Sequence, residues 1–291
     1  MDGIEWQRAK WGILARVWLW LNERAGSWLG DHLIADHPEI KNHLQTRTSP
    51  RRITIIPYGA DEVTDSDPAA IRDLGLEPGR YLSVIARPEP ENSLLEIVSG
   101  FSQKTRGVQL VILGCYDRKN QYHRQVMDAA SGEVRFLGAI YDKSIVSALR
   151  FHSMAYIHGH QVGGTNPSLV EALGAGNAII AHDNRFNRWV AGPDAAYFRD
   201  ARSLAEALDA VTESADRLAA MRSASRARHR SDFRWATVLE AYEALLAGFQ
   251  GHWKEGTVGG PRSRGGQARV PGNTEHKDAS YTHAKRNAKA G

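Results

Sequence analysis

From residue 52 onward, short apolar runs alternate with segments of helical pattern, and this alternation constrains the fold more than any other feature. The runs are rich in β-branched residues, as strands buried on both faces are. Strands are expected at residues 53–56, 81–86, 109–113, 134–137, 154–158 and 178–181, with helices at about 93–104, 120–131, 142–151 and 168–175. The pattern predicts an α/β fold with a Rossmann-like parallel sheet over residues 52 to about 200.

The two ends of the chain have a different character. Residues 4–28 contain few helix breakers and predict one long helix, followed by a short one at 38–44. Two or three helices are predicted between residues 203 and 249. The predicted parts are a helical N-terminal segment with a linker, the Rossmann-like domain, a C-terminal helix and a disordered basic tail, over residues 1–50, 51–232, 233–250 and 251–291.

The net charge of +4 does not predict nucleic-acid binding. The tail at 251–291 holds eight Lys and Arg against three Asp and Glu, which leaves 29 basic and 30 acidic side chains in the first 250 residues. The folded part therefore has no excess of positive charge for a phosphate backbone. The single cysteine, Cys115, cannot form an internal disulfide, and no signal peptide opens the chain, so we expect a cytoplasmic protein.

Residues 11–21 (WGILARVWLWL) form the most apolar stretch, but they are too few to span a bilayer and Arg16 interrupts them. Two interpretations remain open. The segment could lie on the inner face of a membrane as an amphipathic helix with its tryptophans at the interface. Alternatively, its apolar face packs against a neighbouring domain.

The stretch from Gly159 to Ser168, after the predicted strand at 154–158, has the features of a phosphate-binding loop. Paired glycines allow close approach of backbone N–H groups, and Pro167 suits the first turn of a helix whose N-terminus carries partial positive charge. Glu171 lies one turn into that helix and could accept hydrogen bonds from sugar hydroxyls. It could equally complete a capping box with Ser168.

A second candidate segment follows the predicted strand at 81–86. Arg87 could make a bidentate contact with a diphosphate, or it could pair with Glu89 or Glu91 on the surface. Asn92 and Ser93 are both competent N-caps for the next helix, so Asn92 alone carries little information.

Other motifs are weaker. His158 and His160 flank a glycine, but no third ligand stands at a metal-like spacing, so no metal site is predicted and both are expected to line the cleft. No Walker A motif, GxSxG elbow or GxGxxG after the first strand is present. The sequence therefore does not contain the motifs that usually indicate a kinase, a hydrolase or a dehydrogenase.

Taken together, four segments resemble glycosyltransferase family 4, in particular its rhamnosyltransferase-like branch of bacterial polysaccharide biosynthesis. They are residues 2–11 (DGIEWQRAKW), 56–61 (IPYGAD), 87–92 (RPEPEN) and 158–171, and in order and spacing the resemblance covers residues 1 to about 245. It implies a GT-B fold of two Rossmann-like domains, with the nucleotide-sugar donor held by the C-terminal one and the N-terminal acceptor domain mostly missing.

The resemblance also assigns roles to residues. Arg87 and Glu171 are expected to contact the donor diphosphate and its ribose, as the catalytic pair. The other donor-binding positions expected are Gly59, Asn92, His160, Gly163, Gly164, Thr165, Asn166, Pro167 and Ser168. Two positions depart from the family pattern. Asn92 replaces a lysine common among relatives, and Gly163 replaces a sugar-facing glutamate.

The expected reaction transfers a sugar from a nucleotide diphosphate to a saccharide or lipid-linked hydroxyl, with retention of configuration and without metal or other cofactor. Rhamnose as the sugar rests on the branch resemblance alone. A non-catalytic remnant that at most binds nucleotide is the alternative, and a sugar-nucleotide epimerase with the same fold ranks below both.

Overall fold

The computed structural model describes residues 4–8 and 11–255. The chain divides into two compact units, residues 1–242 and 243–291. In the second unit the structure describes only residues 243–255, which continue the helix α11 (Trp235–Glu255). The predicted disordered tail therefore lies outside the described residues from 256 on, whereas residues 251–255 are helical.

The first unit begins with a small layer of two strands. The 3-10 turn η1 (Glu5–Gln7) precedes α1 (Ile13–Leu29), and β1 (Leu33–Ala35) is followed by α2 (Pro38–Gln45), η2 (Pro50–Arg52) and β2 (Ile53–Ile55). β1 and β2 pair with each other in parallel, and Ala35, Ile40, Leu44 and Ile53 form their core. The single long helix predicted over residues 4–28 is wrong, because α1 begins only at Ile13, after Gly12.

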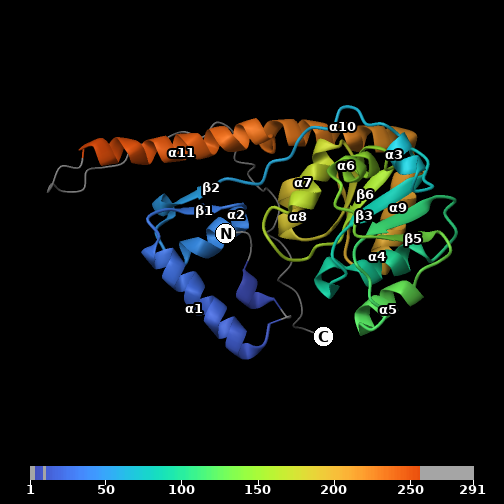
Figure 1. Ribbon diagram of the computed structural model, residues 1–291, viewed down its shortest axis with the longest axis horizontal. Helices are drawn as coiled ribbons and strands as arrows, with labels where there is room; N and C mark the ends of the chain where they lie inside the picture. The colour runs from blue at the N-terminus through green and yellow to red at the C-terminus, as the bar shows by residue number, and fades with distance from the viewer. Residues whose placement is uncertain (1–3, 9–10, 256–291) are drawn as a thin grey trace, which may run out of the picture. The chain divides into compact units, whose positions relative to one another are not determined.

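The main sheet has six parallel strands in the order β5-β4-β3-β6-β7-β8 (Figure 1). Their bounds are Tyr81–Ile85 (β3), Gln109–Leu113 (β4), Val134–Gly138 (β5), Ala155–His158 (β6), Ala178–His182 (β7) and Ala196–Phe198 (β8). Along the chain this order is the 3-2-1-4-5-6 of a dinucleotide-binding fold, which confirms the Rossmann-like prediction.

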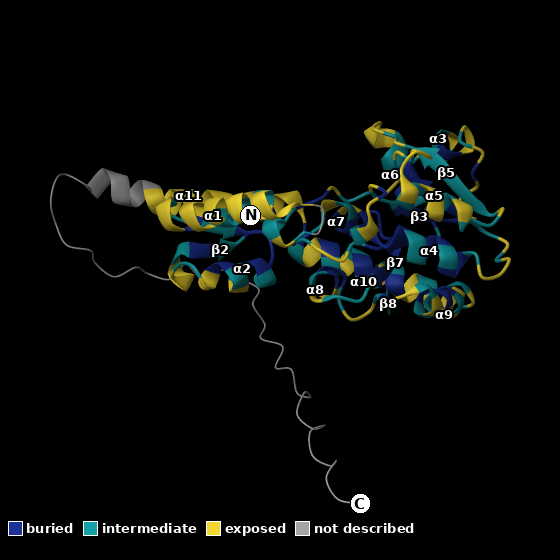
Figure 2. Cartoon of the chain, turned by 90° about the horizontal axis from the view of Figure 1, so that it is seen from below, coloured by how far each residue is buried: buried dark blue, intermediate teal, exposed yellow. Residues whose placement is uncertain are grey.

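Helices cover both faces of this sheet. Alternate residues of each strand point to opposite faces, so Leu82 and Val84 pack on one side while Tyr81 faces the other. The first face is covered by α4 (Leu94–Phe101), α5 (Gln121–Asp128) and α9 (Ala201–Thr212). The second is covered by α3 (Ala69–Arg72), α6 (Lys143–Phe151), α7 (Pro167–Gly174) and α8 (Arg185–Ala191). Figure 2 shows the central strands in the buried colour.

The sequence placed the five strands at 81–86 through 178–181 correctly to within about one residue, but the strand at 53–56 was assigned to the wrong layer. β2 pairs with β1, a strand that the sequence analysis missed, and not with the six-stranded sheet. The predicted domain boundary at residue 51 therefore cuts through the small sheet. The sixth strand of the main sheet is instead β8, which was also missed, before α9 and α10 (Ala215–Asp232).

Candidate functional site

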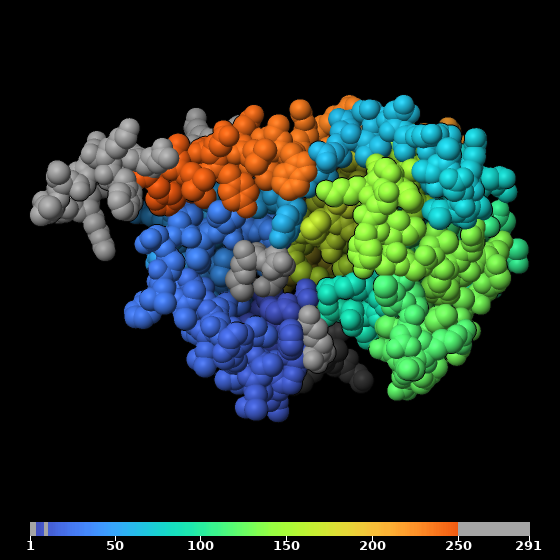
Figure 3. Space-filling model, in the orientation of Figure 1, coloured from blue at the N-terminus to red at the C-terminus, as the bar shows by residue number. Residues whose placement is uncertain are grey.

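The candidate site lies where strand order reverses, between β3 and β6. In such sheets the connections that leave these two strands diverge to opposite sides and leave a crevice at their carboxyl ends. The segment after β3 contains Arg87, and the segment after β6 begins at Gly159. Figure 3 shows the molecular surface hollowed over the olive segment that includes α7, between the teal and the violet-blue parts of the chain.

Arg87 is exposed at this edge, and in the described part of the chain its side chain forms no ion pair. The surface pairing with Glu89 or Glu91 is therefore not observed. Glu91 instead contacts Arg8, with 3.7 Å between Oε1 and Nη1. The guanidinium of Arg87 is thus available to an anionic ligand.

Asn92 does not lie on the surface of the crevice but is buried beneath the Arg87 segment. Its Nδ2 donates to the carbonyl oxygen of Arg87 at 2.8 Å, so its side chain fixes the backbone that carries the arginine. Neither Asn92 nor Ser93 caps α4, as the sequence had suggested. Ser93 has a left-handed backbone with φ of 52° and makes no capping hydrogen bond.

The two segments are bound to each other. Ser93 Oγ donates to the carbonyl of Gly159 at 2.8 Å, and the Gln161 amide donates to the carbonyl of Glu91 at 2.9 Å. A Cβ at Gly159 would collide with the carbonyl oxygen of Asn92. Glycine at position 159 is therefore required for the close approach of the two loops.

The loop before α7 leads directly into the N-terminus of that helix. Asn166 is the N-cap, since its Oδ1 accepts from the Ser168 amide at 3.0 Å, and Pro167 occupies the first turn. The Thr165 amide donates to Asp36 Oδ2 at 2.7 Å. Within the described residues the amides of Gly163, Gly164 and Asn166 have no acceptor from the chain, and Gly164 is itself buried.

Ser168 and Glu171 do not form the capping box that the sequence allowed. Ser168 Oγ contacts the hydroxyl of Tyr156 at 2.7 Å and Arg150 Nη2 at 3.1 Å. The carboxylate of Glu171 pairs with Arg150, with 2.5 Å between Oε2 and Nη2. Glu171 is 48% exposed, whereas the side chain of Arg150 is 8% exposed, so a buried cation orients a carboxylate that still faces solvent.

His158 and His160 stack beneath this loop, and His158 is buried rather than lining a cleft as the sequence suggested. The rings of His158 and His160 lie 4.4 Å apart at 11°, and neither nitrogen of His158 has a hydrogen-bond partner. Burial lowers the pKa of His158 well below its ordinary value. Burial, with the charges of Arg87 and Arg8, lowers the pKa of His160 to about 4. Both rings are therefore neutral at pH 7. Among the described residues no cluster of His, Cys, Asp and Glu could hold a metal ion.

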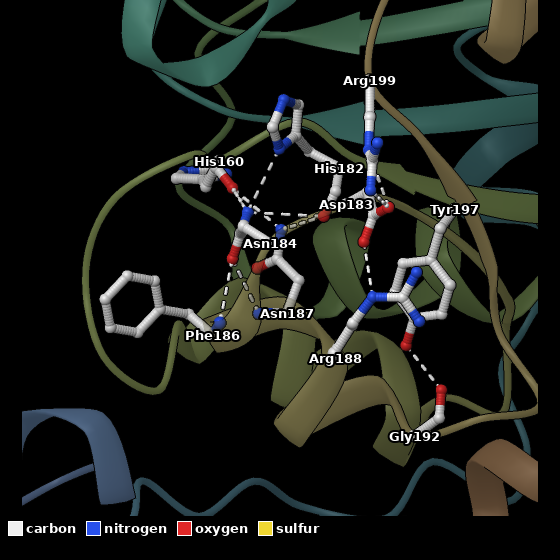
Figure 4. A network of polar contacts seen from close by, with 10 residues as sticks. All are labelled: His160, His182, Asp183, Asn184, Phe186, Asn187, Arg188, Gly192, Tyr197 and Arg199. Atoms are coloured by element: carbon white, nitrogen blue, oxygen red, sulfur yellow. Dashed lines mark hydrogen bonds and ion pairs between the residues drawn. The ribbon is translucent and has the colours of Figure 1, made fainter. Parts of the chain in front are cut away.

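Asparagines from α8 and the turn before it support the backbone of this loop (Figure 4). Nδ2 of Asn184 and of Asn187 both donate to the carbonyl of His160, at 3.0 and 2.8 Å. Oδ1 of Asn184 caps α8 by accepting the amides of Phe186 and Asn187. The carbonyl oxygen of His160 is thereby satisfied by two side-chain donors.

Gly59, an expected donor-binding residue, packs against the start of α11. A Cβ on Gly59 would press against the ring of Trp235, and the next residue, Ala60, accepts a hydrogen bond from His229. The chain then runs past Gly174 at the C-terminal end of α7, since the Val63 amide donates to the carbonyl of Gly174. The structure therefore gives Gly59 a packing role and does not place it with the donor loop.

Several residues that organise the site were not predicted from the sequence, namely Asp36, Arg150, Tyr156, Asn184 and Asn187. Most of them act across long separations, such as the 129 residues between Asp36 and Thr165. An arginine within the apolar pattern of α6 was the one local signal, because a buried arginine needs a partner.

Sequence comparison finds two matches. Residues 1–61 match a family described as a domain of unknown function, DUF1972. A phosphatidyl-myo-inositol mannosyltransferase of Mycolicibacterium smegmatis is 30% identical over 205 residues, which cover 65% of this chain and 51% of that protein. The chain thus spans about half the length of the curated relative that it matches.

Solved structures share the fold at low identity. The Anabaena protein HepE in complex with UDP superposes with a TM-score of 0.71 at 15% identity, covering 84% of this chain and 70% of HepE. Sucrose-phosphate synthase from Thermosynechococcus elongatus gives 0.69 at 17% identity, covering 86% and 66%. The chain therefore has an α/β fold similar to that of GT-B glycosyltransferases.

Proposed function

We propose that this chain carries the donor site of a glycosyltransferase that moves a sugar from a nucleotide diphosphate to an acceptor hydroxyl. The observation that carries the proposal is that Arg87, which pairs with no carboxylate among the described residues, follows β3, while a loop whose Gly163, Gly164 and Asn166 amides have no acceptor among the described residues follows the neighbouring β6. The mannosyltransferase relative and the UDP complex of HepE support the same ligand class.

The chemistry follows from where charge develops. When the sugar leaves the donor, negative charge accumulates on the departing diphosphate, and fixed N–H dipoles and a guanidinium lower the energy of that state. Because His158 and His160 are neutral at pH 7, Arg87 and Arg8 supply the positive charge beside them. We propose that these groups act without a metal ion, so a chelator should leave turnover unchanged.

Glu171 is proposed to bind the ribose of the nucleotide. Its carboxylate is half exposed and can accept hydrogen bonds from hydroxyl groups. Arg150 holds one oxygen, which limits the positions that the carboxylate can take. A substrate-binding carboxylate that is already oriented loses little entropy when the ligand arrives.

The finer proposals concern the sugar and the stereochemistry. Rhamnose is the proposed sugar, a saccharide or a lipid-linked saccharide the proposed acceptor, and retention the proposed outcome. Turnover with dTDP-rhamnose, compared with UDP-glucose and GDP-mannose, tests the first. The anomeric configuration of the isolated product, read from its NMR coupling constants, tests the last.

Membrane contact is proposed through α1 and Trp11, which lies two residues before it. Large apolar side chains along this segment are exposed, and Figure 2 shows much of α1 in the exposed colour. They are Trp11, Ile13, Leu14, Val17, Trp18 and Leu21. Among the described residues no helix has the length and apolarity needed to cross a bilayer. The proposed contact is peripheral, on the inner face of the membrane.

Co-sedimentation with vesicles tests the membrane proposal. Vesicles of phosphatidylglycerol and phosphatidylcholine should carry down the wild type, and the Leu14→Glu/Trp18→Glu variant should stay in the supernatant. If the wild type and the variant sediment equally, α1 does not form the membrane contact. If neither sediments, the exposed face has another partner.

The donor site is tested by calorimetric titration of the whole chain with UDP, dTDP and GDP. One nucleotide should bind saturably, and Arg87→Ala and Glu171→Ala should each weaken that binding, while Arg202→Ala, a surface arginine on α9, serves as the matched control. No binding by a chain whose thermal unfolding is cooperative would refute the donor site. It would favour a remnant without nucleotide affinity.

A further inference from the structure

Asp36 joins the loop before α7 to the N-terminal layer. Asp36 follows β1, and its Oδ2 accepts the Thr165 amide at 2.7 Å. Its backbone carbonyl accepts a second hydrogen bond, from Thr165 Oγ1. Asp36 is 6% exposed and Thr165 is 2% exposed, so both hydrogen-bond donors of Thr165 are used inside the protein.

The position of the Asp36 carboxylate depends on the absence of a side chain at residue 164. A Cβ at Gly164 would collide with both carboxylate oxygens of Asp36. Gly164 does not have a positive φ, so its backbone does not itself require glycine. Close approach of the carboxylate is therefore the reason that glycine is needed here.

Neighbouring residues dock the same segment onto the donor domain. The His37 ring packs edge-on against Trp189, with centroids 4.6 Å apart, and Glu39 pairs with Arg185 at 3.0 Å. Both partners belong to α8, whose N-cap region supports the carbonyl of His160. The Asp36 contact is thus one part of a wider contact between the β1–α2 turn and the donor domain.

This arrangement changes which amides can bind the donor. An anion cannot use the N–H of Thr165 while Asp36 holds it, and the Ser168 amide is taken by Asn166. Gly164 and Asn166 are the chain neighbours of Thr165, and Gly163 is one residue further away. Fixing Thr165 therefore restricts the directions of its neighbours' N–H groups.

We infer that Asp36 is a positioning residue for the donor loop, which holds the loop through Thr165 in the conformation that presents the amides of Gly163, Gly164 and Asn166 to the diphosphate. The inference rests on the proposed function, because it names the group that preorganises the same site. A loop fixed before binding loses less conformational entropy when the donor arrives. Asp36 thereby contributes to donor affinity without itself contacting the donor.

The experiment is a set of UDP, dTDP and GDP titrations with four variants, each first checked for cooperative thermal unfolding. Asp36→Asn keeps an acceptor for the Thr165 amide and should bind the nucleotide within about threefold of the wild type. Asp36→Ala and Gly164→Ala should each weaken binding about tenfold. Asp31→Asn, an exposed carboxylate on the same layer, is the matched control and should have no effect.

The double variant Asp36→Ala/Gly164→Ala makes the test specific. If the glycine is needed only to admit the carboxylate, the double variant binds no worse than Asp36→Ala alone, so the two effects do not add. Independent, additive losses would overturn the inference. Tighter binding by Asp36→Asn would also overturn it, because the carboxylate would then be opposing the anion.

Hydrogen exchange of the Thr165 amide, followed by NMR without ligand, provides a readout that does not depend on nucleotide. Protection should persist in Asp36→Asn and be lost in Asp36→Ala. If the wild type binds no nucleotide, the proposed function fails, whatever the exchange shows. If the wild type binds and Asp36→Ala binds equally well, only the role of Asp36 fails.

Discussion

Arg150 and Glu171 form an ion pair, 2.5 Å from Nη2 to Oε2, in which the cation is buried and the anion is half exposed. The same Nη2 lies 3.1 Å from Ser168 Oγ, which contacts the buried hydroxyl of Tyr156. A carboxylate on the first turns of α7 is thus oriented from α6. The pair is asymmetric, since water can replace the partner of Glu171 but cannot easily replace that of Arg150.

This asymmetry predicts that the two single substitutions destabilise the chain to different extents. Glu171→Ala should lower the free energy of unfolding by about 1 to 3 kcal/mol, because a buried guanidinium loses its anion. Arg150→Met should cost less, since Glu171 can be hydrated. In urea denaturation the double variant should then be more stable than Glu171→Ala alone. The account is wrong if Arg150→Met is the more damaging single change.

Arg87→Ala should leave stability within about 0.5 kcal/mol, because the side chain is exposed and pairs with no carboxylate among the described residues. It should weaken binding of the favoured nucleoside diphosphate about tenfold or more, through loss of a charge-assisted contact. The corresponding monophosphate lacks the second phosphate, so its affinity should change less. Equal losses for the two nucleotides in calorimetric titration would place Arg87 away from the β-phosphate.

Asn92→Lys should not strengthen donor binding, although relatives of the family that the sequence resembles have lysine there. Position 92 is buried, and its amide holds the carbonyl of Arg87. We expect a loss of about 1 to 3 kcal/mol in stability, together with weaker nucleotide binding. Thermal unfolding and titration measure the two effects. Tighter binding at unchanged stability would mean that a lysine at residue 92 reaches the crevice.

Acid should destabilise the chain through His160. Its pKa is lowered from 6.5 to about 4, mainly by burial, so between these values the unfolded chain binds a proton that the folded chain does not. Stability is therefore retained above pH 6.5 and falls as the pH is lowered through this window, by about 2 kcal/mol at pH 5 for this one residue. His160→Gln should lose less stability than the wild type between pH 7 and pH 5 in chemical denaturation. A loss of the same size in both proteins would exclude His160 as a source.

The two expected donor segments lie together in the structure, as the topology of a doubly wound sheet predicts. Ligand sites of a doubly wound sheet gather at the carboxyl ends of strands, so finding β3 and β6 was enough to bring Arg87 and the Gly159 to Ser168 loop to one crevice. The roles within each segment were less predictable. Asn92 and Thr165 face inward, where they hold backbone groups and cannot contact a ligand directly.

The sequence by itself determined the alternation of strands and helices, five strands of the six-stranded sheet, and the Gly-rich start of α7, because these depend on apolar periodicity and backbone preferences within a few residues. Only the tertiary structure decided that β2 pairs with β1, that Glu171 turns to Arg150, and that Asp36 takes the Thr165 amide. In each case several other residues could have formed the same kind of contact. Packing between segments far apart in the chain selects the partner, and a local sequence pattern contains no information about that packing.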